Sequence, residues 1–335
     1  MAKVGINGLG RIGRAIFKII QDTPELEVAA VNDLVPPDNL AYLLKYDTVY
    51  GRYEKTVEHT ESSLIVGGKE FPVYNMKDPA QLPWEELGVD IAIESTGVFT
   101  KSEDLRKHIE AGAKYVILSA PVKGDGIGTV VHGVTQNGNI DRIISCASCT
   151  TNAITPPMEI MNRRLGVKKA LMTTVHAYTS SQSIVDSPKK NFRRGRAGAA
   201  NFVPTSTGAA IATTKALPEL KDRFNGAAIR GPVTTGSIAD IVFLAERKTS
   251  IEEINNIFRE EAESDRYKGV LGVTDEPLVS SDIIQDPRAA IIDLEMTMVV
   301  DGDLVKIMSW YDNEWGYSSQ LVREAARIAR DARDI

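Results

Sequence analysis

Short apolar runs alternate with amphipathic stretches through the first half of the chain. The pattern predicts a helix over Ile12–Gln21, with Ile16, Ile19 and Ile20 on its apolar side, and a second helix over Ser102–Ala111. Buried strands are predicted at Val4–Asn7, Val28–Asn32, Ile91–Ser95, Tyr115–Ser119 and Arg142–Ser145. Strands that alternate with helices indicate a mostly parallel sheet covered on both faces, which is a doubly wound α/β domain.

The second half of the chain has a different pattern, with longer runs in which apolar and polar residues alternate. These runs are Ala170–Ala177, Gly226–Arg230, Ile238–Ala245, Ala289–Val300 and Leu304–Trp310. Such alternation is typical of antiparallel strands with one face toward solvent. Helices are predicted at Thr207–Lys215, Ile251–Ser264 and Ser318–Arg333. We therefore expect a second, α+β domain with a largely antiparallel sheet.

Length and composition agree with a two-domain globular protein. The chain has 335 residues, 43% of them hydrophobic and 25% charged, which is ordinary for globular proteins. Its net charge of −6 argues against a nucleic-acid partner, although five basic residues gather inside the aperiodic segment Ser180–Gly208. A long aperiodic segment inside a compact domain is normally functional. No apolar run reaches the roughly 20 residues of a membrane span, and two cysteines are too few for a disulfide framework. A cytoplasmic protein is expected.

A glycine-rich motif follows the first predicted strand and opens the first helix. It reads Gly8-Leu9-Gly10-Arg11-Ile12-Gly13, and Asp33 ends the second strand 20 residues later. In a Rossmann-type domain such glycines permit a tight turn, close approach of a pyrophosphate, and close helix–strand packing. The acidic residue binds ribose hydroxyls and its charge opposes a 2′-phosphate, so NAD is predicted rather than NADP.

Cys149 is the candidate nucleophile because it lies between a predicted strand and a predicted helix. A helix N-terminus favours a reactive thiolate. Of the four histidines, His176 ends an apolar strand, where active-site groups project, and is the candidate base. His59 and His108 lie in charged surroundings and are predicted to be at the surface. Cys146 is expected to be a small buried residue, the alternative being a redox pair with Cys149. No second ligand pair accompanies the two cysteines, so no metal site is expected.

Five motifs in order then resemble the glyceraldehyde-3-phosphate dehydrogenase family over essentially the whole chain. They are N-G-L-G-R-I-G-R, S-C-T-T-N, V-H-A-Y-T, F-V-P-T-S-T-G-A-A and W-Y-D-N-E-W-G-Y-S. The resemblance implies an NAD-dependent, phosphorylating oxidation of glyceraldehyde 3-phosphate to 1,3-bisphosphoglycerate, reversible and glycolytic, through a thioester on Cys149. It also implies a homotetramer and an NAD-binding domain over residues 1–148. A catalytic domain would span residues 149–314, and the helix 315–335 would return to the first domain.

The same resemblance implies roles for single residues. Cys149 and His176 match the catalytic pair. Positions that match cofactor contacts are Gly8, Gly10, Arg11, Ile12, Gly13, Asp33, Lys77, Thr96, Ser119 and Asn313. Positions that match the substrate and phosphate sites are Ser148, Thr150, Thr179, Arg194, Thr207, Gly208 and Arg230. Among the latter, Thr179 and Arg230 correspond to the site for the substrate's phosphate, and Ser148, Arg194, Thr207 and Gly208 to that of the attacking phosphate.

Two departures from the family pattern and several rival functions stay open. Ser187 stands where strictly NAD-dependent members often carry leucine, which leaves room for some use of NADP. The segment Gly231–Gly236 differs from the usual V-P-T-P-N-V. Erythrose-4-phosphate dehydrogenase and aspartate-semialdehyde dehydrogenase share the layout, but His176-Ala177-Tyr178-Thr179 disfavours the first and the paired phosphate sites disfavour the second. A non-catalytic binding protein would lack the nucleophile or the base, and a nucleic-acid-binding role has only the basic segment to support it.

Overall fold

The structure is a computed structural model that describes residues 1–124, 126–135 and 141–331. The chain forms two compact units. The first comprises Met1–His132, the segment ending at Ala147, and the residues from Leu321 onward. The second comprises Ser148–Gln320 and a short segment that begins at Gly133. The division falls inside the last helix, α8 (Trp315–Asp331), which begins three residues before the predicted start.

The first unit is built on a nine-stranded sheet in the order β10-β11-β9-β8-β1-β2-β7-β6-β5. Its strands are β1 (Ala2–Asn7), β2 (Leu26–Asn32), β5 (Val57–His59), β6 (Ser63–Val66), β7 (Lys69–Tyr74), β8 (Ile91–Glu94), β9 (Tyr115–Leu118), β10 (Gly128–Thr129) and β11 (Ile143–Ser145). All pairs are parallel except those of β6 with β5 and β7. The strand order changes direction at β1, which is where doubly wound sheets bind ligands at the carboxyl ends of their strands.

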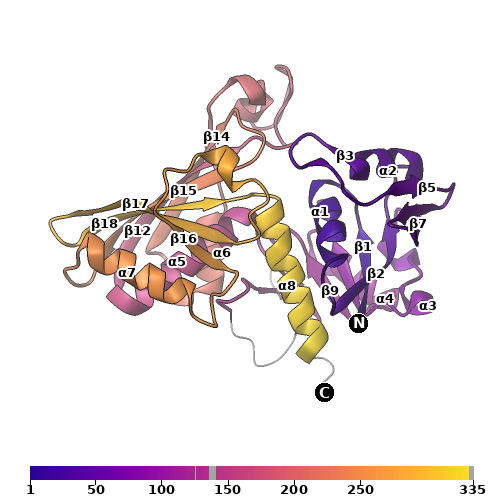
Figure 1. Cartoon of the computed structure of the whole chain (residues 1–335), viewed down its shortest axis with the longest axis horizontal. Helices are drawn as coiled ribbons and strands as arrows, with labels where there is room; N and C mark the ends of the chain where they lie inside the picture. The colour runs from indigo at the N-terminus through magenta and orange to yellow at the C-terminus, as the bar shows by residue number, and fades with distance from the viewer. Residues whose placement is uncertain (125, 136–140, 332–335) are drawn as a thin grey trace. The chain divides into compact units, whose positions relative to one another are not determined.

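Helices flank this sheet, as the sequence pattern predicts (Figure 1). They are α1 (Arg11–Ile20), α2 (Pro37–Lys45), α3 (Trp84–Leu87) and α4 (Ser102–Glu110), and a small ribbon of β3 (Tyr46–Asp47) and β4 (Gly51–Arg52) follows α2. Helix α1 packs on β1 and β2 through a stripe that includes Ile16, Phe17 and Ile20, each at most 1% exposed. Helix α4 packs on β9, and the doubly wound architecture is confirmed.

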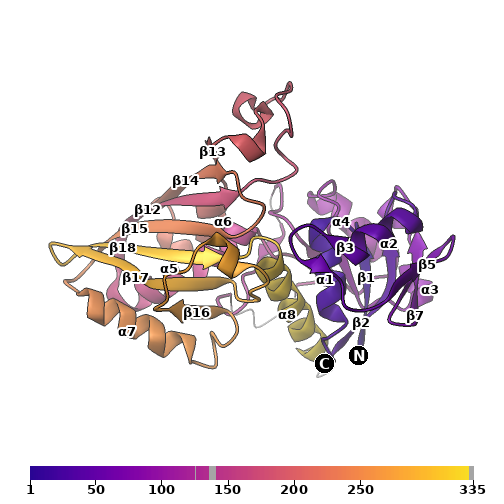
Figure 2. The ribbon, with the colours of Figure 1, turned by 45° about the horizontal axis from the view of Figure 1, so that its top comes forward.

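The second unit contains a seven-stranded sheet in the order β13-β14-β12-β15-β18-β17-β16, which is seen as a fan in Figure 2. The strands are β12 (Val167–Ala177), β13 (Val203–Ser206), β14 (Phe224–Gly231), β15 (Ser237–Ala245), β16 (Leu271–Thr274), β17 (Ala290–Val300) and β18 (Leu304–Tyr311). The predicted largely antiparallel sheet is confirmed, with two parallel pairs, β12 with β14 and β16 with β17.

Helices α5 (Cys149–Leu165), α6 (Ala209–Ala216) and α7 (Ile251–Ala262) pack on this sheet, and α5 also contacts α6 and α7. Apolar side chains remain exposed on the sheet strands, including Leu171 at 66%, Met298 at 48% and Leu304 at 42%. The segment Ser180–Gly208 is not wholly irregular, because it holds two short 3-10 helices at Phe192–Gly195 and Gly198–Ala200 as well as β13. Within the described residues, no helix combines the length and apolar character needed to cross a membrane.

Candidate active site

The start of α5 places Cys149. Ser148 is the N-cap residue, and its hydroxyl accepts a hydrogen bond from the backbone N–H of Thr151 at 3.2 Å. Cys149 is therefore the first residue of the helix, as predicted, where unpaired N–H groups and the helix dipole favour negative charge. Ala147, just before the cap, has a φ of 56°, a left-handed conformation that an L-residue adopts at a cost of about 1–2 kcal/mol. A strained turn thus directs the chain from β11 into α5.

Cys149 and His176 lie together although 26 residues separate them. The Cys149 sulfur lies 3.4 Å from Nε2 of His176, which is 4% exposed near the end of β12. Nδ1 of His176 lies 2.7 Å from the carbonyl oxygen of Ala177 and 2.5 Å from Nη1 of Arg230. Arg230 reaches this position because β14 pairs with β12 in a register that sets it opposite His176. Nucleophile, base and a cation therefore meet in one place.

The protonation of this group follows from its contacts. Burial, and then the positive charge of Arg230, lowers the pKa of His176 to about 3, so the ring is neutral at neutral pH. Burial raises the pKa of the Cys149 thiol, whereas Arg230 and hydrogen bonds with Thr150 act in the opposite direction. Because a guanidinium only donates, its contact suits the His176 tautomer that accepts at Nδ1 and donates from Nε2 to sulfur. The other tautomer, with Nδ1–H donating to Ala177, makes Nε2 a base.

Tyr311 contacts the surroundings of both catalytic candidates, and no sequence pattern described above assigns it a role. Its hydroxyl lies 2.9 Å from Oγ1 of Thr150 and 2.8 Å from Oγ1 of Thr174. Its ring meets the His176 ring edge-on at a centroid distance of 6.0 Å. Tyr311 is 1% exposed, so these contacts are held in the core. The only sequence signal was its place inside the W-Y-D-N-E-W-G-Y-S motif.

The glycine loop between β1 and α1 has the geometry that a pyrophosphate requires. Gly8 has a φ of 94°, and a Cβ there would lie 2.7 Å from the backbone nitrogen of Thr96. A Cβ on Gly13 would lie 2.0 Å from the Gly8 carbonyl oxygen, whereas one on Gly10 would meet open space. Helix α1 also has no side-chain cap at its N-terminus. The three glycines thus serve the turn, the packing and an open approach to helix N–H groups, so the loop fits a dinucleotide.

Asp33 lies at the edge of this loop, directly after β2. One carboxylate oxygen accepts from the backbone N–H of Leu9 at 2.7 Å, and the other accepts from Val35 at 2.9 Å. Lys77 and Thr96 are exposed and Ser119 is partly buried, all in loops that follow strands of this sheet. Asn313 belongs to the second unit, where its Oδ1 accepts from Ser237 at 2.9 Å. Arg11, at the start of α1, forms an ion pair with Asp47.

One expectation about the histidines is wrong. His108 is completely buried rather than at the surface, because it faces inward from α4 and hydrogen-bonds to Glu94 and Trp84. The surrounding charged residues of α4 point outward and hid this in the sequence. His59 is exposed, as predicted. Cys146 is buried at 4% exposure, also as predicted, and both cysteines are free thiols.

Two sets of groups in the second unit could hold anions. Within the described residues, Nε of Arg230 is buried without a hydrogen-bond partner, and Thr179 lies two residues beyond the end of β12. Arg194 donates from Nε to Oγ1 of Thr205 at 3.1 Å and from Nη2 to the Ser206 carbonyl at 3.4 Å. Thr207 and Gly208 follow at the N-terminus of α6, where Gly208 is the N-cap residue.

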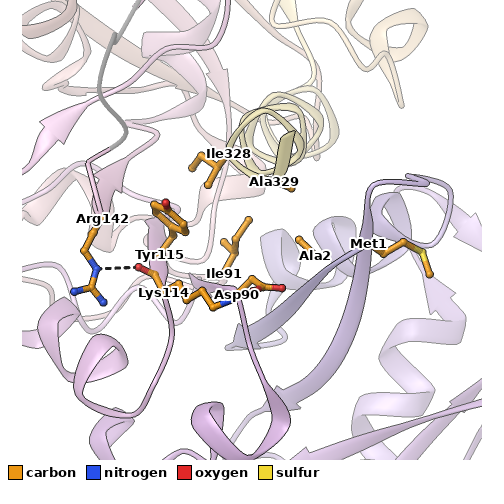
Figure 3. Close-up of a pocket in the computed structure, with 9 residues that line it drawn as sticks. All are labelled: Met1, Ala2, Asp90, Ile91, Lys114, Tyr115, Arg142, Ile328 and Ala329. Atoms are coloured by element: carbon orange, nitrogen blue, oxygen red, sulfur yellow. Dashed lines mark hydrogen bonds and ion pairs between the residues drawn. The ribbon is translucent and has the colours of Figure 1, made fainter. Parts of the chain in front are cut away.

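A cavity of about 440 Å³ in the first unit, shown in Figure 3, contains none of these residues. It lies at the amino ends of β1, β8, β9 and β11, the opposite edge of the sheet from the glycine loop. Its cations are already engaged: Lys114 pairs with Asp90 at 2.7 Å, and Nε of Arg142 donates to the Lys114 carbonyl at 3.1 Å. Its size alone does not make it the reactive site.

Comparison with known proteins identifies the family. Residues 2–102 match the sequence model described as "Glyceraldehyde 3-phosphate dehydrogenase, NAD binding domain", and residues 148–313 match that of the "C-terminal domain". The chain belongs to the glyceraldehyde-3-phosphate dehydrogenase family. It is 49% identical over 324 residues to the glyceraldehyde-3-phosphate dehydrogenase of Streptomyces coelicolor, covering 96% of each chain. It is 48% identical over 332 residues to glyceraldehyde-3-phosphate dehydrogenase 1 of Bacillus subtilis, covering 98% of each. For the Thermotoga maritima enzyme the identity is 49% over 326 residues, covering 96% of this chain and 97% of the relative.

As a member of the glyceraldehyde-3-phosphate dehydrogenase family, the chain is an NAD-dependent oxidoreductase. The NAD-binding-domain match spans β1, the glycine loop, α1 and Asp33, so the cofactor predicted from those residues is confirmed. The match over residues 148–313 spans Cys149, His176, Arg194 and Arg230. The two halves predicted from periodicity are thus the two domains of this family.

Proposed function

We propose that this chain catalyses the phosphorylating, NAD-dependent oxidation of D-glyceraldehyde 3-phosphate to 1,3-bisphosphoglycerate, a reversible step of glycolysis. The observation that carries the proposal is the 3.4 Å approach of the Cys149 sulfur to Nε2 of His176 at the start of α5. A thiol beside a neutral imidazole and a helix N-terminus is an activated nucleophile suited to aldehydes. The family membership names the aldehyde.

The chemistry follows from these groups. The Cys149 sulfur forms a bond to the aldehyde carbon, the thiol proton passes by way of His176 to the carbonyl oxygen, and a thiohemiacetal results. His176 then takes the hydroxyl proton as the carbon loses hydride, which leaves a thioester on Cys149. NAD, when bound, supplies the hydride acceptor. Finally an oxygen of hydrogen phosphate attacks the thioester carbon, and the carbon–sulfur bond breaks with its electron pair on the Cys149 sulfur. The acyl phosphate leaves, the proton held by His176 returns to the sulfur, and the proton of the phosphate passes to solvent.

For the cofactor, we propose that residues 1–148, with the helix from residue 315 onward, form the binding domain and residues 149–314 the catalytic domain. The compact units differ slightly from these bounds, because Ser148 and the first turns of α8 up to Gln320 belong to the second unit. Gly8, Gly10 and Gly13 would admit the pyrophosphate, and Asp33 would bind the adenosine ribose. The remaining proposed contacts are Arg11, Ile12, Lys77, Thr96, Ser119 and Asn313. Supporting this, Ser237 fixes the amide orientation of Asn313, a side chain suited to orient the nicotinamide amide.

A change at Asp33 should alter the choice of cofactor. Asp33→Ala is expected to raise the NADP:NAD ratio of kcat/KM, because a negative charge that opposes the 2′-phosphate is removed. The effect should be about 1–3 kcal/mol, or 5- to 150-fold. Asp33→Asn belongs beside it, since the amide keeps an acceptor for the N–H of Leu9. Asp38→Ala, at an exposed carboxylate of α2, is the matched control. An unchanged NADP:NAD ratio in both Asp33 variants would contradict this role of Asp33 and make Ser187 the next candidate for discrimination between NAD and NADP.

The two anion sites should separate in kinetics. We propose that Thr179 and Arg230 hold the phosphate of the aldehyde, and that Ser148, Arg194, Thr207 and Gly208 serve the attacking phosphate. Thr150 is proposed as a further substrate or phosphate contact, assigned to neither of the two sites. Arg194→Leu is then expected to raise KM for phosphate by about 10-fold or more, the loss of one charge-assisted contact. Arg230→Leu should raise KM for the aldehyde similarly and also lower kcat, because Arg230 contacts His176. Arg193→Leu is the control for Arg194→Leu, because Arg193 is exposed and directly precedes Arg194 in the sequence. The reverse pattern would exchange the two assignments.

We propose a homotetramer, in line with the family. Leu171 and Leu304 are exposed on the second unit's sheet and line the same hollow, and exposed apolar surface of this kind commonly marks a protein interface. Mass measurement in solution tests this assignment. A cytoplasmic location stays a prediction.

One assay tests the proposed reaction. Purified protein is mixed with NAD and glyceraldehyde 3-phosphate, and NADH formation is followed by its absorbance with and without phosphate or arsenate. We expect turnover that depends on phosphate or arsenate, because the thioester needs an attacking anion. Erythrose 4-phosphate serves as the competing aldehyde. A higher kcat/KM for erythrose 4-phosphate, or turnover that ignores phosphate, would contradict the proposal.

A further inference from the structure

Buried polar side chains link the carboxyl ends of four neighbouring strands in the first unit. Asn7 ends β1 and is in register with Asn32 on β2 and with Glu94 on β8. Asn32 donates from Nδ2 to Oδ1 of Asn7 at 2.7 Å, and Asn7 donates from Nδ2 to Oε2 of Glu94 at 2.6 Å. Asn32 also exchanges two hydrogen bonds with the backbone of Met76, just beyond β7. None of the three side-chain residues is more than 4% exposed.

Asn32, Asn7 and Glu94 thus form a hydrogen-bonded row, and this row continues from Glu94 to side chains of the flanking helices. Nε2 of His108 lies 3.1 Å from Oε2 of Glu94, and the indole N–H of Trp84 donates to Nδ1 of His108 at 3.1 Å. All three residues are fully buried. An indole can only donate, so Nδ1 of His108 is an acceptor. The ring is therefore neutral, carries its proton on Nε2, and donates that proton to Glu94.

Glu94 accepts from four donors in total. Besides Asn7 and His108, the backbone N–H of Thr96 donates to Oε1 at 2.8 Å, and the Thr96 hydroxyl donates to the same oxygen. Only an ionised carboxylate accepts at every one of these positions. A buried charge held by neutral donors is stable only while the set is complete, because each missing donor leaves desolvated charge unpaired.

The strand members of the row lie next to proposed cofactor contacts or bind one through a hydrogen bond. Asn7 precedes Gly8, Asn32 precedes Asp33, and Thr96 is itself an exposed contact. The loops also interlock, because the Ser95 hydroxyl donates to the Gly8 carbonyl at 2.6 Å. A shift of Glu94 would therefore move the loops on which NAD must rest.

We propose that Trp84, His108 and Glu94 are positioning residues for NAD, which act through Asn7 and Thr96 to hold the loops in the binding geometry before the cofactor arrives. The inference rests on the proposed cofactor contacts of Gly8, Asp33 and Thr96. Loops that are already ordered add no conformational entropy cost to NAD binding. Loops that populate other conformations lower the apparent affinity for NAD, because only the fraction of molecules in the competent conformation can bind it. None of the three residues touches the reacting atoms.

Glu94→Gln tests the role directly. Glutamine keeps the shape but places an NH₂ group against Thr96 on one side or against Asn7 and His108 on the other, so that donor faces donor. The dissociation constant for NAD, measured by titration calorimetry on the full chain, is expected to rise about 10-fold or more. With saturating NAD, kcat should stay within about threefold of wild type. Trp84→Phe removes only the indole N–H that donates to His108. It should also raise the dissociation constant for NAD, but by a smaller factor than Glu94→Gln.

Tyr267→Phe is the matched control. The Tyr267 hydroxyl donates to the carboxylate of Glu159 at 2.5 Å, and this buried bond belongs to the second unit, whereas the loops in question belong to the first. Its loss should lower the melting temperature without weakening NAD binding. Should Glu94→Gln not fold, Trp84→Phe alone decides. Unchanged NAD affinity in the folded variants, with wild type binding normally, would overturn the positioning role, whereas a wild type that did not bind NAD would contradict the proposed function itself.

Discussion

Cys149→Ser is expected to reduce NADH formation from glyceraldehyde 3-phosphate by a factor on the order of 10⁴ to 10⁶, as removal of a catalytic nucleophile generally does. A serine hydroxyl fits the start of α5 equally well. It is a far poorer nucleophile at neutral pH, however, and neither the helix N-terminus nor Arg230 overcomes its high pKa. NAD binding should be nearly unchanged, because the glycine loop and Asp33 belong to the other unit.

The control for this variant is Cys146→Ser. Cys146 is a buried free thiol in the same motif and has no part in the proposed chemistry, so its variant should keep most of the activity. Steady-state rates and NAD titrations on both proteins give the comparison. Substantial turnover in Cys149→Ser, or equal losses in the two variants, would show that the nucleophile has been placed wrongly.

His176→Asn is expected to lower kcat by roughly 10²- to 10⁴-fold, the usual contribution of a positioned acid–base group. Asparagine can still hydrogen-bond, but it cannot accept the thiol proton or the hydroxyl proton. The reaction of Cys149 with iodoacetamide should slow as well, because the ring lies 3.4 Å from the sulfur and assists formation of the thiolate.

His59→Asn is the control for the histidine, since His59 is exposed and its Nδ1 contacts only the neighbouring backbone carbonyl of Thr60 among the contacts described. Alkylation rates, read by mass spectrometry of the Cys149 peptide, and steady-state kinetics are measured together. Alkylation of Cys149 at the wild-type rate in His176→Asn would show that His176 does not activate the Cys149 thiol. Loss of turnover with unchanged alkylation would leave His176 a base for the hydroxyl proton alone.

Much of the fold could be predicted because its strands and helices carry strong periodicity. The ends of α4 and β9 fall within one residue of their predicted positions. Helix α2 and the hairpin strands β5, β6 and β7 were not predicted, since they are short, partly exposed and mix polar with apolar residues. The alternation of apolar and polar residues is the same in parallel and antiparallel strands. It therefore does not predict that β12 and β14 pair in parallel, which only the structure shows.

Local chemistry is what the sequence by itself determined about this protein. The glycines of the loop, Asp33 at a strand end and Cys149 at a helix start are set by neighbours a few residues away, so their spacing predicts the cofactor and a candidate nucleophile. Only the tertiary structure decided which distant groups act on them. Arg230 meets His176 through the register of two strands, and Tyr311 reaches Thr150 from a third. His108 is buried against Glu94 because α4 turns that one side chain inward. Contacts between residues far apart in the chain depend on packing and register, and no local pattern encodes them.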